Sequence, residues 1–377
     1  MKIKLEAVCK RIYAGGDVPK SNFSEVKTNQ YNIPIYANAE KNEGLYGYTD
    51  VPRETELSIT VAARGTIGYT AIRREPFFPV VRLITIVPDL LKVSERYLYY
   101  LIRNCKPQSS GTSIPQLTVP DIKKTLLNDI AINEQELIAN KLDIVSRIID
   151  LRKLELQRLD ELIKARFVEL FGDLMENPFN WPMKTIADVS LFLKSGLSRK
   201  LSDEDIGLPV IRSGNIQNGQ FIFDNVKYWY KDDPQGANTK DYVLEDGDVL
   251  VNFINSSSQI GKTAIYRDTG RDCIYTTNIF RMKLADNCNE YYYNWFAMSD
   301  YYYRHLQNII QPAVNQSSFT TVNFLKLPIP LPAKDKQNEF AEFVKQVDKS
   351  KVVVPSKIKY TIFAIMLSVS FGQITSI

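Results

Sequence analysis

Two stretches far apart in the chain repeat one short pattern. Residues 64–73 read RGTIGYTAIR, and residues 258–267 read SQIGKTAIYR. Both contain an Ile-Gly pair followed, one residue later, by Thr-Ala-Ile, which is a turn signal placed before a short β-rich run. We expect the shared residues to be scaffold. We expect the residues that differ between the copies to determine any difference in what the two copies recognise.

The segments around each copy recur in the same order. β-rich runs precede the pattern at residues 33–38 (IPIYAN) and 208–216 (LPVIRSGNI). Aromatic segments follow it at residues 96–104 and 290–306, and we expect the longer one, EYYYNWFAMSDYYYRHL, to be an aromatic helix. Two copies are too few for a solenoid. The order therefore predicts two domains of one fold.

A long helix is expected between the two copies. Residues 134–170 contain no Gly or Pro. The residues found at alternating intervals of four and three from Ile138 are mostly apolar, a pattern that is typical of a coiled coil. A second helix start at 334–348 resembles residues 133–145. The alternative is an ordinary core helix of a bundle. The predicted α+β organisation is a first domain (1–130), a central long helix (131–173), a second domain (174–332), a second, shortened spacer helix (333–354) and an atypical apolar tail (355–377).

Composition sets broad limits on the class of protein. At 377 residues the chain exceeds the usual size of one hydrophobic core, which favours two domains. Lys and Arg number 47 against 43 Asp and Glu, which permits a polyanionic partner without requiring one. Four dispersed cysteines and a single histidine indicate reduced thiols and no zinc site. The start resembles no secretory signal and the apolar tail is too short to span a bilayer, so we expect a cytoplasmic protein that binds no membrane.

Several motifs suggest chemistry that the rest of the sequence does not support. Residues 256–263 (SSSQIGKT) approach a phosphate-binding loop, but Ser256 stands where the first glycine is needed, and the sister copy has no lysine. Residues 177–179 (NPF) resemble part of an adenine-methyltransferase motif without its glycine-rich cofactor loop. His305 has no partner for a relay or a metal. We therefore predict no catalytic and no metal-binding residues.

Polar loops at equivalent places in the two copies remain as candidate binding residues. Arg and Lys pair with guanine edges or phosphates, and Asn and Gln pair with adenine edges. For any single residue, a solvated loop side chain is the alternative explanation. The candidate DNA-binding residues are Asn38, Lys41, Arg64, Tyr69, Ser113 and Gln116 in the first copy, and Arg212, Asn215, Asn255, Ser258, Gln259, Lys262, Asn315 and Gln316 in the second.

The ordered set of segments resembles the specificity subunit of type I restriction-modification systems. The resemblance lies in WPMKTIADV, IRSGNI, IGKTAIY, NEQELIANKLDIV and RFVELFGD, and it covers residues 1 to about 350. It implies two target-recognition domains that each read half of a split double-stranded DNA sequence, separated by long helices that pack as an antiparallel coiled coil and set the spacing.

The same resemblance implies a non-catalytic subunit that works with partners. Two modification (methyltransferase) subunits would supply S-adenosylmethionine chemistry, and restriction subunits would use ATP and magnesium. No cofactor is expected on this chain itself. The alternative from another class is a coiled-coil scaffold whose β-rich lobes bind proteins.

The end of the chain departs from the family pattern. Pro355 disrupts the second helix soon after it starts. An antiparallel second helix would then face only the later part of the first. We expect four apolar residues of the earlier part to be covered by the tail or by another protein chain, as a subunit interface: Ile138, Leu142, Val145 and Ile149.

Overall fold

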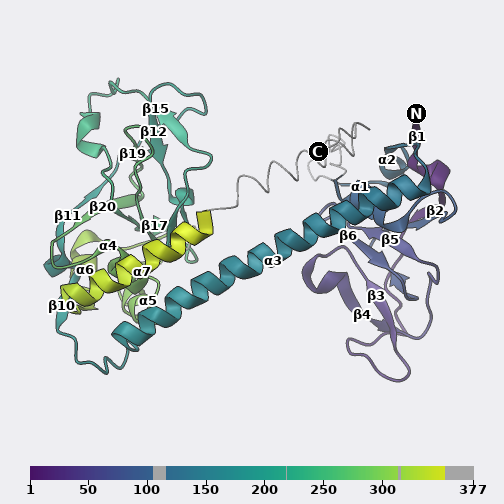
Figure 1. The fold of residues 1–377 in the computed structure, drawn as a ribbon, viewed down its shortest axis with the longest axis horizontal. Helices are drawn as coiled ribbons and strands as arrows, with labels where there is room; N and C mark the ends of the chain where they lie inside the picture. Colours follow the sequence, from purple (N-terminus) through teal and green to yellow (C-terminus); the bar gives the residue numbers. More distant parts are fainter. Residues whose placement is uncertain (105–115, 218, 313–315, 353–377) are drawn as a thin grey trace. The chain divides into compact units, whose positions relative to one another are not determined.

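The computed structural model describes residues 1–104, 116–217, 219–312 and 316–352 (Figure 1). Contacts divide the chain after Lys153 into two compact units, and each unit buries hydrophobic clusters of its own. The division lies inside helix α3 (Ile132–Phe171). Within the described residues, no helix combines the length and the apolar character that a membrane crossing needs.

A four-stranded antiparallel sheet forms the centre of the first unit. Its strands lie in the order β2, β8, β5, β6. β5 and β8 are buried along their whole length. Their sequences, SITV and ITIVP, suit this place because β-branched side chains pack well on a pleated surface. The bounds are β2 (Cys9–Ala14), β5 (Ser58–Val61), β6 (Thr70–Arg73) and β8 (Ile84–Pro88).

Smaller elements surround this sheet. β3 pairs antiparallel with β4 and parallel with β7, and β1 pairs with β9. The strands are β1 (Lys2–Lys4), β3 (Ile33–Tyr36), β4 (Leu45–Thr49), β7 (Phe78–Pro79) and β9 (Leu126–Asn128). The helices are η1 (Leu5–Val8), η2 (Lys41–Gly44), α1 (Glu95–Asn104) and α2 (Val119–Lys123).

The second unit repeats this topology strand for strand. Its sheets have the orders β11-β20-β16-β18, β15-β12-β19 and β10-β22. The corresponding strands are β10 (Met183–Thr185), β11 (Ser190–Ser195), β12 (Leu208–Ile211), β15 (Lys227–Trp229), β16 (Val249–Asn252), β18 (Thr263–Ile265), β19 (Ile274–Tyr275), β20 (Ile279–Leu284) and β22 (Pro328–Pro330). Even a β-bulge recurs, between Cys9 and Arg11 in β2 and between Ser190 and Phe192 in β11. The two similar domains predicted from the sequence are confirmed.

The second unit also contains elements of its own. Two short pairs, β13-β14 and β17-β21, lie beside the repeated sheets. These elements are β13 (Ile216–Gln217), β14 (Gln220–Phe221), β17 (Ile254–Asn255) and β21 (Ser317–Ser318). The remaining helices of this unit are η3 (Ile186–Val189), η4 (Ser213–Asn215), η5 (Thr239–Tyr242) and α6 (Thr321–Leu325), of which η3 and α6 repeat η1 and α2 of the first unit.

The expected single aromatic helix is two helices. α4 (Glu290–Phe296) ends at Ala297, and α5 (Asp300–Gln307) begins after Ser299. The Ser299 side chain accepts a hydrogen bond from the Tyr302 backbone and donates one to the Phe296 carbonyl. The prediction was wrong because this serine caps a new helix without any Gly or Pro to mark the break.

The two long helices pack against each other in opposite directions. Phe340 of α7 (Lys334–Val352) meets Phe167 and Phe171 of α3, with ring centroids 5.4 and 5.5 Å apart. Towards the other end of α7, Lys351 pairs with Asp160 at 2.7 Å. Residues later in α7 therefore lie beside residues earlier in α3, which confirms the antiparallel pairing.

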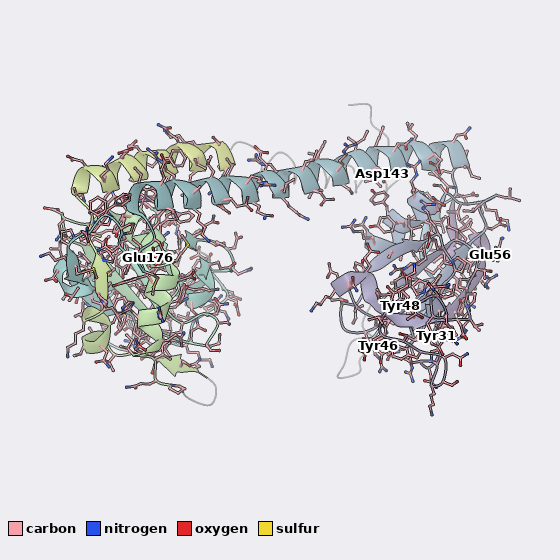
Figure 2. All side chains as sticks on the ribbon, turned by 90° about the horizontal axis from the view of Figure 1, so that it is seen from below. Tyr31, Tyr46, Tyr48, Glu56, Asp143 and Glu176 are labelled. Carbon is pink, nitrogen blue, oxygen red and sulfur yellow. The ribbon has the colours of Figure 1, made fainter. Side chains whose placement is uncertain are left out.

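The earlier part of α3 packs on the first unit. Asp143 accepts a hydrogen bond from the Tyr100 hydroxyl at 2.7 Å, within an α1 contact that also includes an ion pair to Arg96 (Figure 2). Of the four residues expected at a subunit interface, Ile138 packs on the first unit's core and Leu142 is buried, while Val145 and Ile149 are half-buried. The tail beyond Val352 lies outside the described residues.

A buried glutamine fastens the start of each long helix to its own unit. Gln135 accepts a hydrogen bond from the Ser94 N–H at 2.8 Å and donates to the carbonyls of Lys92 and Ile130. In the second unit, Gln337 accepts from Asn289 N–H at 2.8 Å. It donates to two carbonyls in the same way, those of Asn287 and Pro332. One carboxamide thus satisfies three backbone groups in each copy.

We predict that Gln337→Leu lowers the free energy of unfolding of the second unit by about 2–4 kcal/mol, because buried backbone groups lose their partners. Gln346→Leu on the exposed face of the same helix is the matched control and should have little effect. All three tryptophans, Trp181, Trp229 and Trp295, belong to the second unit, so urea unfolding followed by tryptophan fluorescence reports on that unit. Equal shifts for the two variants would contradict the role of Gln337.

Candidate nucleic-acid interface

The repeated Ile-Gly pattern forms the same turn in both units. The Gly68 N–H donates to the Ala62 carbonyl at 2.9 Å, and the Gly261 N–H donates to the Asn252 carbonyl at 2.7 Å. Both glycines have positive φ, +88° and +80°, a backbone region that favours glycine. The turn connects two adjacent strands, β5 to β6 or β16 to β18, and no helix follows it as in a phosphate-binding loop. The shared residues are scaffold, as expected.

A second segment lies beside this turn in both units. The Leu117 N–H donates to the Ala63 carbonyl at 3.0 Å, and the Phe319 N–H donates to the Phe253 carbonyl at 3.2 Å. The next residue is a threonine that caps a short helix in each copy, α2 and α6. By this register, Arg64 and Gln116 of the first unit correspond to Ile254 and Ser318 of the second, which form a strand pair.

In the first unit, two predicted residues contact each other directly. Arg64 donates to the side-chain oxygen of Gln116 through Nε at 3.0 Å and Nη2 at 2.6 Å. Asn38 lies beneath them, because its Oδ1 accepts the Ala63 N–H at 2.8 Å. Its Nδ2 donates to the Val81 carbonyl. The amide of Asn38 is therefore committed to holding the loop that presents Arg64.

The other first-unit candidates lie around this loop. Lys41 is exposed at the start of η2. Tyr69 is half-buried after Gly68, and burial together with the Glu43 carboxylate raises its pKa. Ser113 lies outside the described residues.

In the second unit, three predicted residues line one polar hollow. Asn255, Gln259 and Lys262 come from the segment between β16 and β18. We call this volume of about 430 Å³ the second-unit hollow, and its lining residues are Ser213, Gly214, Ile216, Gln217, Asn255, Gln259 and Lys262. Gln217 was not among the candidates, although its place just after the IRSGNI segment and its carboxamide could have marked it.

Asn215 and Arg212 support the hollow from within. The Asn215 side chain is 3% exposed. Its Oδ1 accepts the Arg212 N–H, and its Nδ2 donates to the carbonyls of Ile222 and Asp224. Arg212 donates through Nη2 to the Asn225 carbonyl at 2.6 Å. Both side chains are engaged with the backbone of their own unit.

The remaining second-unit candidates lie on or near the surface. Ser258 is exposed and its hydroxyl lies 3.3 Å from that of Ser256. Gln316 is exposed beside β21. Asn315 lies outside the described residues. Among the described residues, Gln259 has no hydrogen-bond partner for its side chain and Lys262 has no ion pair.

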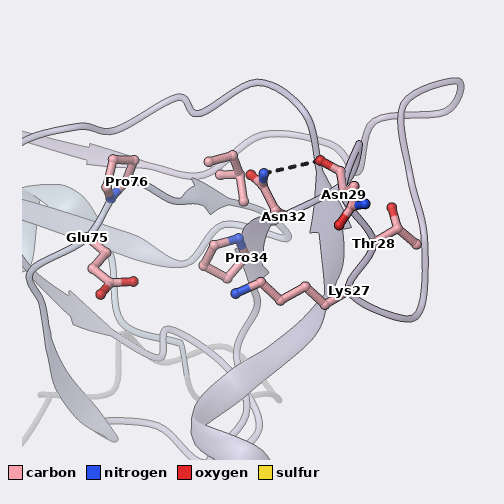
Figure 3. Close-up of a pocket in the computed structure, with 8 residues that line it drawn as sticks. Lys27, Thr28, Asn29, Asn32, Pro34, Glu75 and Pro76 are labelled. Atoms are coloured by element: carbon pink, nitrogen blue, oxygen red, sulfur yellow. Dashed lines mark hydrogen bonds between the residues drawn. The ribbon is translucent and has the colours of Figure 1, made fainter.

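A larger hollow in the first unit lies at the opposite end of β3 from Asn38. It has a volume of about 770 Å³, and the side chains of Lys27 and Glu75 extend into it from two loops (Figure 3). In the second unit, the register of β12 with β19 places Arg271 where the first unit has Glu75. There Arg271 pairs with Asp205 at 2.7 Å. The two units thus differ at this end as well.

A family comparison matches almost the whole chain. Residues 1–161 and 178–361 match the model of the type I restriction modification DNA specificity domain. The chain belongs to this family. Each matched segment of the specificity-domain family contains one copy of the repeated topology, including its Ile-Gly turn.

Individual relatives agree with the specificity-domain family. A putative type I restriction enzyme specificity subunit of Methanocaldococcus jannaschii is 28% identical over 177 residues, 47% of this chain and 41% of the relative. A putative type I specificity subunit of Mycoplasma pneumoniae is 32% identical over 169 residues, 42% of this chain and 46% of the relative. Each alignment therefore spans less than half of the relative's length.

The fold is also similar to a solved structure. The type-I restriction-modification system S subunit from M. genitalium aligns with 98% of this chain and 94% of its own, with a TM-score of 0.52 and 14% identity. At this identity the likeness concerns the fold alone.

We predict that Gly261→Ala destabilises the second unit more than Gly236→Ala, by about 1–3 kcal/mol, because overpacking adds to backbone strain. Both glycines have φ near +80° (+80° and +85°), so the strain is similar. Only at position 261 would the added Cβ meet Leu306, 2.1 Å from Cδ2. Urea unfolding followed by tryptophan fluorescence measures the difference. Indistinguishable midpoints would show that the turn does not pack on α5 as described.

Proposed function

We propose that this chain is the DNA-reading, non-catalytic subunit of a type I restriction-modification system, and that each unit reads one half of a split double-stranded target. One observation carries the proposal. The two units share the backbone of the Ile-Gly turn and differ in the polar side chains around it, Arg64 and Gln116 in one and Gln259 and Lys262 in the other. One fold that presents two sets of hydrogen-bonding groups suits two different half-sites.

The proposed readers are exposed or half-buried members of the candidate set. In the first unit these are Lys41, Arg64, Tyr69 and Gln116, and in the second they are Asn255, Ser258, Gln259 and Gln316, with Gln217 added. Lys262 is the proposed phosphate contact of the second unit. Asn38, Arg212 and Asn215 receive a supporting role, because their side chains bond to backbone groups of their own unit. Ser113 and Asn315 stay predictions.

The chemistry of restriction and modification belongs, in this proposal, to partner subunits in the cytoplasm. Two modification subunits would bind S-adenosylmethionine and methylate adenine, and restriction subunits would use ATP and magnesium. Support comes from the family membership and from the relatives, which are named as specificity subunits. Val145 and Ile149, which are half-buried, stay a proposed contact region for another chain or for the tail, whereas Ile138 already packs on the first unit's core and Leu142 is buried.

Selection of DNA from a random double-stranded library by the purified chain tests the proposal. We expect two short conserved tracts with a gap of constant length, and we expect changes of the gap length to abolish selection. Affinity should fall steeply with added salt, because phosphate contacts release counterions. A protein-binding scaffold predicts no enrichment and no such salt dependence, and that result would overturn the proposal.

We predict that Lys262→Ala weakens binding of all DNA sequences about equally and reduces the slope of log K against log salt by about 0.9, the value for one lost phosphate contact. Lys262 lines the second-unit hollow and has no ion pair among the described residues. Lys184→Ala, which removes an exposed charge on β10, is the control and should leave the slope unchanged. Titrations at several salt concentrations measure both slopes. Loss of sequence preference without a change of slope would assign Lys262 to a base instead.

A further inference from the structure

We propose that the two units read different bases: Arg64, oriented by Gln116, contacts a guanine in the first half-site, and Gln259 contacts an adenine in the second. This inference rests on the proposed function and names the base that each unit reads.

The hydrogen bonds of Arg64 leave one edge of its guanidinium available. Nε and Nη2 both donate to Gln116 Oε1, at 3.0 and 2.6 Å, so the side edge of the group is occupied. The end edge, formed by Nη1 and Nη2, still offers two parallel N–H donors. In the major groove, guanine presents two acceptors, N7 and O6, whereas adenine places a donor beside N7. Two donors in a fixed fork therefore match guanine and reject adenine.

The orientation of Arg64 is set before any DNA binds. The backbone of Gln116 is held next to the Arg64 loop by the bond from Leu117 N–H to the Ala63 carbonyl. Ala63 is also bonded on its other side, through its N–H, to Asn38. Side chains ordered in the free protein lose less conformational entropy on binding. Gln116 is thus a positioning residue for the donor fork of Arg64.

The second unit has no equivalent of this pair. Ile254 and Ser318 occupy the positions of Arg64 and Gln116, and neither can supply a guanidinium fork. Arg212, the nearby arginine, donates to the Asn225 carbonyl and does not line the second-unit hollow. A different base is therefore expected in the second half-site.

Carboxamides line the second-unit hollow instead, and one of them is uncommitted. Asn255 accepts the Ser256 N–H through Oδ1, and Gln217 donates to the Gly214 carbonyl through Nε2. Among the described residues, Gln259 has no partner for either Oε1 or Nε2. One donor and one acceptor side by side match the N6 donor and N7 acceptor of adenine. Gln259 is therefore the residue that contacts adenine.

Library selection with four variants tests both assignments. Arg64→Lys keeps the charge and removes the fork, so we expect loss of preference at one G·C pair of the first half-site, by roughly 5- to 150-fold. Gln116→Ala should weaken preference at that same pair, and Gln116→Glu, which restores the acceptor for Arg64, should retain it. Gln259→Ala should relax one A·T pair of the second half-site. Each variant should leave the other half-site unchanged.

The outcomes separate this inference from the proposed function. If the wild-type chain enriches no split sequence, the proposed function fails. If it does, and Arg64→Lys or Gln259→Ala weakens all sequences equally, the residue contacts phosphate and the inference is overturned. It is equally overturned if the relaxed position in the first half-site is not G·C or that in the second is not A·T. Unchanged far-UV circular dichroism and thermal unfolding confirm that the variants are folded, and tryptophan fluorescence adds a check for Gln259→Ala, because the tryptophans lie in the second unit.

Discussion

The arrangement of each unit depends on one buried carboxamide at the start of a long helix. Gln135 and Gln337 each pair with one backbone N–H and two backbone carbonyls that would otherwise be buried without partners. An unpaired buried backbone group costs about 1–3 kcal/mol, so the glutamine, the helix start and the loop before the aromatic helix are ordered together. The same three bonds recur at the start of α3 and at the start of α7.

Apart from the buried glutamine, the residues that the two units share are mostly buried, and those that differ are mostly in surface loops. Both units share three features that satisfy a backbone requirement of the fold. These are a central paired strand (β5 in the first unit, β16 in the second), a glycine of positive φ and a helix-capping threonine. The differing residues lie in the loops around the Ile-Gly turn, where a side chain can change without loss of core packing. A fold organised this way can acquire new binding groups in one unit and leave the other unaffected.

Most of the fold could be predicted from the sequence, because periodicity and repeated order reflect backbone geometry. The expected helix from residue 134 to 170 is observed as Ile132–Phe171, and the repeated strands have the expected order. The exception, the break at Ser299 between α4 and α5, depends on a side-chain cap that a pattern of aromatic residues does not reveal.

The candidate site was less predictable, and the reason is chemical. Asn38, Asn215 and Gln259 are all carboxamides in polar loops. The side chains of the first two are hydrogen-bonded to backbone groups of their own units, and of the three only the side chain of Gln259 has no hydrogen-bond partner among the described residues. Composition cannot distinguish these cases, because the donor and acceptor of an amide suit a peptide group as well as a base edge. The pairing of Arg64 with Gln116 depends on residues 52 positions apart in the chain, a contact that only the folded structure brings together.

Hydroxyl-radical footprinting on the selected DNA shows whether two units of one fold read two half-sites. At saturating protein, we expect two protected tracts separated by an unprotected stretch. We also expect a Gln259→Ala and Lys262→Ala double variant to lose one tract and keep the other. A single continuous tract, or the loss of both tracts together in the double variant, would contradict the reading of one half-site by each unit.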